Sequence, residues 1–140
     1  MVTKQALAQQ KLPDSDKVTV NVGLVDLAQL DLLVEEGFYS NRTDFVRTAI
    51  RNQLQVHADA IRQTVTRKRY VMGMYRYGRH ELEQLVASGQ RLEIHVLGLA
   101  VIEDDVPASL AREAIASIQV LGAFIAPPAV REALADRLQS

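Results

Sequence analysis

The feature that most constrains the fold is a single strand pattern at residues 17–22, KVTVNV, with no second strand near it in the sequence. Apolar and polar residues alternate there, which is the period of a half-buried β-strand. A lone strand leaves backbone N–H and C=O groups unpaired along both edges. The sequence therefore predicts a two-fold dimer in which this strand pairs antiparallel with its own copy. One face carries Val18, Val20 and Val22, and the other carries Lys17, Thr19 and Asn21.

Two helices are predicted directly after this strand. Leucine and valine recur at helical spacing as far as Val34, and Gly37 lies where a left-handed residue would end a helix of about four turns. Asn41, followed three residues later by Asp44, has the form of an N-cap that opens a second helix. Its apolar stripe continues past Leu54, so we expect this helix to run on or to be followed closely by another.

The polar residues of this segment suit contact with DNA. In the dimer, the outer face of the ribbon presents lysine, threonine and asparagine twice. In the major groove, lysine can bond guanine, asparagine can bond adenine, and threonine can contact a thymine methyl group or bond an acceptor. The start of the second helix offers free backbone N–H groups and Arg42 to a phosphate. The buried valine face would then pack against the two helices of each chain.

Residues 17–54 resemble the ribbon-helix-helix family of DNA-binding transcriptional regulators (MetJ/Arc/CopG type). The resemblance rests on the KVTVNV strand, the Gly37-Phe38-Tyr39 turn, and the start of the second helix, NRTDFVR, followed by AIR. It implies an intertwined dimer that binds double-stranded DNA. It also implies site residues of two kinds: Lys17, Thr19 and Asn21 contact bases, and Asn41, Arg42 and Thr43 contact phosphate.

Charge is distributed unevenly along the chain. The formal net charge is −1, which as an average argues against a polyanionic partner. Residues 42–79, however, hold nine basic and two acidic groups, whereas residues 91–140 hold four basic and seven acidic groups. This polarity favours an anionic partner for one part of the chain, and a solvated basic helix face is the alternative interpretation.

The second half of the chain contains an approximate repeat. The tripeptides Val71-Met72-Gly73, Val96-Leu97-Gly98 and Val120-Leu121-Gly122 recur at intervals of 25 and 24 residues. Each is followed by a helical pattern, at 78–87, 107–114 and 128–137. This order predicts parallel strands joined by helical crossovers, as in a leucine-rich-repeat-like solenoid. A small α/β domain without repeat symmetry is the alternative. The apolar strand near 118–125 would leave an open edge, which favours self-association.

The fold class predicted from these patterns is α+β, an intertwined ribbon-helix-helix dimer followed by a small α/β repeat-like region. We divide the chain into a flexible arm at 1–16, a DNA-binding domain at 17–54, a helical basic connector at 55–69 and a self-association domain at 70–140. Homodimerisation is assigned to strand 17–22 and the two following helices. A higher oligomer or filament is assigned to residues 70–140.

Other chemistry is not indicated by the sequence. There are no cysteines, and His57, His80 and His95 lack the spacing of metal ligands, so neither a metal nor a cofactor is expected. No phosphate-binding glycine loop or nucleophile elbow is present, and we do not expect an enzyme. No apolar run approaches the ~18 residues of a membrane span. The expected location is the cytoplasm, in association with the nucleoid.

These observations lead to a sequence-specific, DNA-binding transcriptional regulator as the main hypothesis. A nucleoid-organising or filament-forming DNA-binding protein is one alternative. An antitoxin that represses its own operon is another; its toxin partner is less favoured because antitoxin tails tend to be disordered and acidic, whereas residues 70–140 show apolar periodicity. A protein-interaction module that never binds DNA is the remaining alternative.

Overall fold

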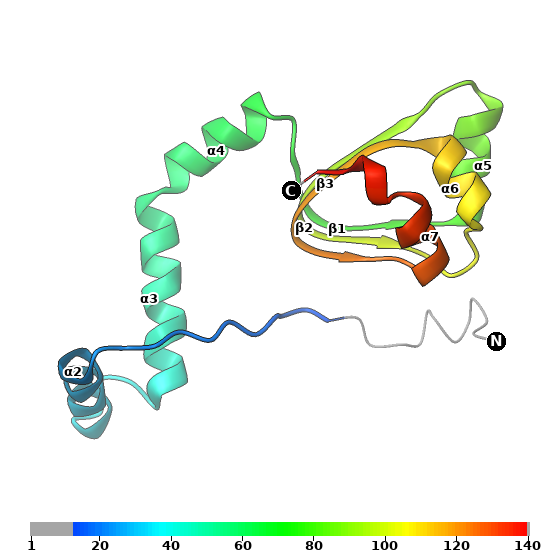
Figure 1. Cartoon of the computed structure of the whole chain (residues 1–140). Coiled ribbons are helices and arrows are strands. Elements are labelled where there is room, and N and C mark those ends of the chain that lie inside the picture. Colours follow the sequence, from blue (N-terminus) through cyan, green and yellow to red (C-terminus); the bar gives the residue numbers. More distant parts are fainter. Residues whose placement is uncertain (1–12, 140) are drawn as a thin grey trace. The chain divides into compact units, whose positions relative to one another are not determined.

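The computed structural model describes residues 13–139 and contains both helices and a four-stranded parallel sheet (Figure 1). Residues 13–64 and residues 65–139 form two separate compact units. We refer to them as the first unit and the second unit, and each is described by itself. Most of the predicted arm at 1–16 lies outside the described residues; within it, residues 13–16 are exposed and form neither helix nor strand.

The first unit is built on helices α2 (Leu24–Glu35) and α3 (Arg42–Val56) and includes the start of α4 (Ala58–Arg67). Helix α2 has 12 residues, slightly fewer than the predicted four turns. It ends as the sequence predicts: Gly37 has φ = 84°, and the N–H of Phe38 donates to the carbonyl of Leu33 at 2.9 Å. This left-handed cap satisfies carbonyl groups that the end of the helix would otherwise leave unpaired.

Helix α3 begins at the predicted N-cap. The side chain of Asn41 accepts a hydrogen bond from the N–H of Asp44 at 2.8 Å. The Asp44 carboxylate accepts in turn from the N–H and the hydroxyl of Ser40, one residue before the cap. The predicted continuation is confirmed as well, because α3 ends at Val56 and α4 begins at Ala58 after the single residue His57.

Residues 17–22 do not form a strand in the single chain. A strand is defined by its backbone pairing, and the described residues of the first unit contain no strand that could pair with this segment. The antiparallel ribbon therefore stays a prediction. Its valines are open to solvent in the single chain, with exposed fractions of 83% for Val18, 71% for Val20 and 49% for Val22.

The second unit alternates strands and helices. Strands β1 (Val71–Tyr77), β2 (Leu92–Ile102), β3 (Ile115–Ile125) and β4 (Leu138–Gln139) lie in sequence order in one parallel sheet. Helices α5 (Arg79–Ala87), α6 (Ala108–Ala114) and α7 (Pro128–Ala133) follow the first three strands, and Figure 1 shows the long strands curving together. The predicted strand–helix order and parallel pairing are confirmed; the leucine-rich-repeat-like class stays a prediction. The last predicted helix is divided, because α7 ends before Leu134 and a short 3-10 helix, η1 (Ala135–Arg137), follows.

Equivalent positions of the sequence repeat are paired with each other in the sheet. Gly73 lies opposite Gly98, and Gly98 lies opposite Gly122, so equivalent residues of successive repeats are neighbours in space. All three glycines have positive φ, at 139°, 141° and 117°. A Cβ atom at Gly98 would lie 2.2 Å from the carbonyl oxygen of Gly73, and one at Gly122 would lie 2.0 Å from that of Gly98. Only glycine fits at the second and third positions.

The hydrophobic core of the second unit lies between the sheet and its helices. Its fully buried side chains come from both layers and include Leu82, Ile94, Ile102, Ile115, Ile118 and Leu134. Two arginines form hydrogen bonds between the last repeat and the one before it. Arg112 donates to the carbonyl of Ala133 at 2.7 Å and to Asp136 at 2.8 Å, and Arg137 donates to the carbonyl of Ile115 at 2.6 Å.

Candidate nucleic-acid interface

The residues predicted to contact bases are available for a partner. Lys17, Thr19 and Asn21 are all exposed, and within residues 13–139 none of their side chains forms a hydrogen bond or an ion pair. The backbone of Lys17 alone is engaged, since its N–H donates to the carboxylate of Asp16 at 2.8 Å. The three side chains lie on the segment that precedes α2.

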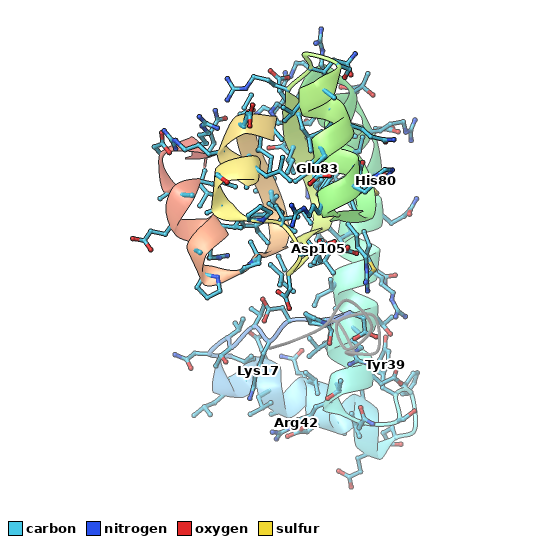
Figure 2. All side chains as sticks on the ribbon, turned by 90° about the vertical axis from the view of Figure 1, so that its right-hand side faces the viewer. Lys17, Tyr39, Arg42, His80, Glu83 and Asp105 are labelled. Carbon is cyan, nitrogen blue, oxygen red and sulfur yellow. The ribbon has the colours of Figure 1, made fainter. Side chains whose placement is uncertain are left out.

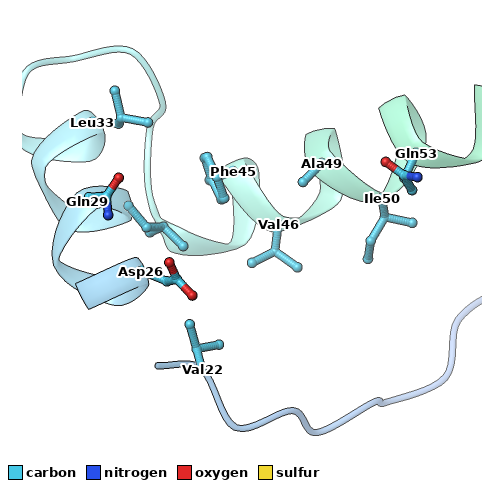
Figure 3. Close-up of a pocket in the computed structure, with 10 residues that line it drawn as sticks. Val22, Asp26, Gln29, Leu33, Phe45, Val46, Ala49, Ile50 and Gln53 are labelled. Carbon is cyan, nitrogen blue, oxygen red and sulfur yellow. The ribbon is translucent and has the colours of Figure 1, made fainter. Parts of the chain in front are cut away.

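An apolar groove runs between α2 and α3 of the first unit (Figure 3). It has a volume of about 640 Å³, and Val22, the last residue of the segment 17–22, lies at its rim with its side chain directed toward it. The groove is thus continuous with the valine face of residues 17–22. Its walls are formed by Leu30 and Leu33 of α2 and by Phe45, Val46, Ala49 and Ile50 of α3.

The first unit lacks an adequate core of its own. Leu30 is the only buried hydrophobic residue among residues 13–64, and it retains 8% exposure. On α3 no residue is buried, and Ile50 and Leu54 are each 54% exposed. Burial of apolar surface is the main favourable term in folding, so a partner that covered this exposed apolar surface would stabilise the unit. A second copy of the same segment would supply the complementary surface.

The residues predicted to contact phosphate lie together at the start of α3. Asn41 is extended, with φ = −166°, and its side chain is occupied by the cap to Asp44. The backbone N–H groups of Arg42 and Thr43 have no acceptor among the described residues, as expected in the first turn of a helix. Two free N–H groups at the positive end of the helix dipole make a suitable contact for an anion.

Arg42 has an internal partner that the sequence did not reveal. Its guanidinium donates two hydrogen bonds to Asp31 of α2, from Nε and Nη2, both at 2.8 Å. These bonds lower the pKa of Asp31 and raise the pKa of Arg42, which is labelled in Figure 2. The two residues are 11 apart and meet only because the turn between the helices is tight, with Tyr39 and Phe45 packed edge to face at 5.0 Å. No local pattern could have predicted this contact.

The basic segment at 42–79 is only partly neutralised. Arg42, Arg62 and Arg79 form ion pairs with Asp31, Asp59 and Glu83. The other six basic residues form no ion pair within the described part of the chain, and they are divided between the units: Arg47 and Arg51 in the first, and Arg67, Lys68, Arg69 and Arg76 in the second. The first unit thus carries unpaired positive charge on α3, the helix whose start holds the phosphate-site residues.

Acidic residues gather at the start of α5 in the second unit. The N–H of Arg79 donates to Asp105 at 3.2 Å, and its guanidinium pairs with Glu83 at 2.6 Å (Figure 2). Within residues 13–139, no set of three histidine, aspartate or glutamate side chains is arranged to hold a metal ion. None of the helices in the same range has the length and hydropathy needed to cross a bilayer.

Comparison with known proteins gives one match. The model of the ribbon-helix-helix transcriptional regulator family matches residues 13–131. The match extends far beyond residues 17–54, to which the resemblance noted from the sequence was confined, and takes in β1, β2 and β3. Searches of curated proteins and of solved structures gave no match. Because the family model covers most of the chain, the protein belongs to the ribbon-helix-helix transcriptional regulator family, a family of DNA-binding regulators.

Proposed function

We propose that the protein binds double-stranded DNA as a homodimer and regulates transcription from specific sites. The observation that carries this proposal is the exposed valine face of residues 17–22 beside the apolar groove between α2 and α3. If two copies pair these segments antiparallel, the valines of the ribbon cover the groove. Lys17, Thr19 and Asn21 of both copies then lie on the opposite, outer face of the ribbon.

In this proposal, the ribbon and the start of α3 contact different parts of the DNA. Lysine, threonine and asparagine on the ribbon read base edges in the major groove. The start of α3 positions the dimer on the backbone through the N–H groups of Arg42 and Thr43 and the guanidinium of Arg42. The second unit joins dimers on neighbouring sites, as its open sheet edges favour. The same edges support a second candidate function, a DNA-organising filament with little sequence preference.

Replacing Asn21 with alanine separates these two functions. For a regulator, we expect the variant to lose about 1–3 kcal/mol of binding to its preferred site and to accept more bases at one position, because a bidentate asparagine–adenine contact carries that much discrimination. The measurement is selection of bound fragments from random duplex at fixed salt, followed by titration of the selected site. Equal binding to all duplexes by both the parent and the variant would support the organising filament instead.

Arg42→Ala is the companion variant for phosphate contact. We expect it to weaken binding to every duplex alike. The slope of the logarithm of the binding constant against the logarithm of the salt concentration should become shallower by roughly one, because one phosphate contact is lost. A change confined to one base position would contradict the proposed role.

Asp31→Asn is expected to strengthen DNA binding. In the free protein Arg42 donates both of its bonds to Asp31, so a phosphate has to compete with this carboxylate. Because an exposed ion pair contributes little, we expect a gain of roughly 1.5- to 5-fold in affinity at low salt, the same for all duplexes. Fluorescence anisotropy with a labelled duplex measures it.

Asp59→Asn is the matched control, because it removes the same charge from the exposed pair with Arg62 on α4. An equal gain in both variants would show that net charge, and not release of Arg42, causes the effect.

A further inference from the structure

The sheet of the second unit has two open edges. Strand β1 pairs with β2 and with no other strand of the described residues. At the opposite side, β3 is covered by β4 only at Ile118 and Gln119, so residues 120–125 have no further strand beside them within the described chain. Among residues 13–139, the one side-chain hydrogen bond to their backbone comes from the guanidinium of Arg131, which donates to the carbonyl of Phe124 at 2.8 Å. An unpaired strand edge presents a row of backbone donors and acceptors that can pair with another chain.

Both edges carry exposed apolar side chains. On β1, Met72 and Met74 are 60% and 61% exposed, and on β3 Leu121 is 48% exposed. Proteins usually protect free edges with charges, prolines or bulges. Within residues 71–77 and 120–125 Arg76 is the only charged residue, and neither segment contains a proline.

The two edges match each other in register. Val71 lies opposite Val96, and Val96 lies opposite Val120. If β1 of a second copy lies beside β3 in the same direction, it repeats the pairings already present inside the chain, with Met72 opposite Leu121 and valine opposite valine.

Strand β4 leaves room for this addition. It pairs at Ile118 and Gln119, directly before the stretch that β1 of the second copy would occupy. Within residues 13–139, the short strand therefore occupies Ile118 and Gln119, whereas an added β1 would lie beside the residues that follow them.

The glycines allow the same stacking. Gly73 has φ = 139°, close to the value for Gly98, although a Cβ atom at Gly73 would meet nothing nearer than the Tyr75 ring at 3.5 Å. The backbone of β1 is thus bent in the same way as that of β2. Inside the sheet, Gly98 lies against the carbonyl of Gly73, and Gly122 lies against the carbonyl of Gly98. The free side of β1 offers the same kind of surface at Gly73 to a glycine carbonyl of another strand.

We propose that the second unit joins a second copy of the chain head to tail, with the β3 edge of one copy pairing in parallel with the β1 edge of the next and Gly122 opposite Gly73. The interface is heterologous, so repeated addition produces a row of copies or a closed ring. The inference rests on the proposed assembly through the second unit and is independent of the DNA contacts.

Cysteine cross-linking tests this arrangement in the full chain, which has no cysteine of its own. Neighbouring strands are about 4.8 Å apart, within the range of Cα separations that a disulfide accepts. We expect an oxidised mixture of Met72→Cys and Leu121→Cys to give a disulfide-linked pair containing one of each variant, and neither variant alone to do so at a comparable yield. Both residues are exposed, so the substitutions should not disturb folding.

A mixture of Met72→Cys with Met74→Cys is the control, because it reports antiparallel pairing of two β1 strands about Gly73. A higher yield in this mixture than in the first, or a yield in the first no greater than that of the single variants, would overturn the proposal.

The DNA-binding function is tested separately in the same background. Asn21→Ala should leave the cross-linking yield unchanged while it weakens DNA binding. Loss of cross-linking with DNA binding intact would refute the head-to-tail contact alone, and the opposite result would refute only the proposed function.

Discussion

Val20→Asp is expected to abolish dimerisation of the protein at micromolar concentration. In the single chain Val20 is 71% exposed, on the valine face that the proposed ribbon buries. Full burial of a valine is worth about 1.5–3 kcal/mol, and two-fold symmetry counts the loss twice. The dimer dissociation constant should therefore rise by at least about 100-fold, since each 1.4 kcal/mol is a factor of ten. An unpaired carboxylate in the interface adds to this.

Thr19→Asp is the matched control, because it places the same charge one residue away on the opposite face of the ribbon. We expect it to reduce DNA binding by repelling phosphate while the dimer persists. Sedimentation or light scattering over a dilution series measures the mass of both variants. A dimeric Val20→Asp variant, or equal dissociation of both variants, would contradict the assignment of the valine face to the dimer interface.

Local signals in the sequence were sufficient to predict the end of α2 and the start of α3. Gly37 and Asn41 act through hydrogen bonds between residues at most a few positions apart, so their capping roles can be predicted from the neighbouring sequence. The parallel order of the second unit was predictable for a similar reason. Its repeat places Val71, Val96 and Val120 at nearly equal intervals, and equivalent residues of stacked repeats become neighbours.

Contacts between distant residues were not predictable in this way. The pair Asp31–Arg42 depends on how the turn brings α2 and α3 together, and neither residue carries a signal of the other. The end of the last helix was misplaced because no glycine or proline marks Leu134, which is fully buried in the core. The ribbon itself depends on a second chain, and its alternating pattern specifies the buried face but not the partner.

Gly122→Ala is expected to destabilise the second unit by several kcal/mol. The new Cβ atom would lie 2.0 Å from the carbonyl oxygen of Gly98, and the residue would hold φ = 117°, a conformation that L residues rarely adopt. Such strain alone costs about 1–3 kcal/mol. The clash is with backbone in the middle of the sheet, so it cannot be relieved by rotating a side chain, and β3 would have to move away from β2.

Alanine variants at two other glycines distinguish the effect of backbone strain from the effect of the steric clash. Gly89 has φ = 72° with nothing within 4 Å of an added Cβ atom, and Gly73 has φ = 139° with the nearest contact at 3.5 Å, so within a single copy of the chain alanine at either position adds strain without a backbone collision. Urea unfolding followed by tyrosine fluorescence measures all three variants; Tyr70, Tyr75 and Tyr77, three of the four tyrosines, lie in the second unit. We expect Gly122→Ala to lower the midpoint far more than either control. Equal shifts would mean that φ alone requires glycine at these positions and that the strands are not stacked with their glycines in contact.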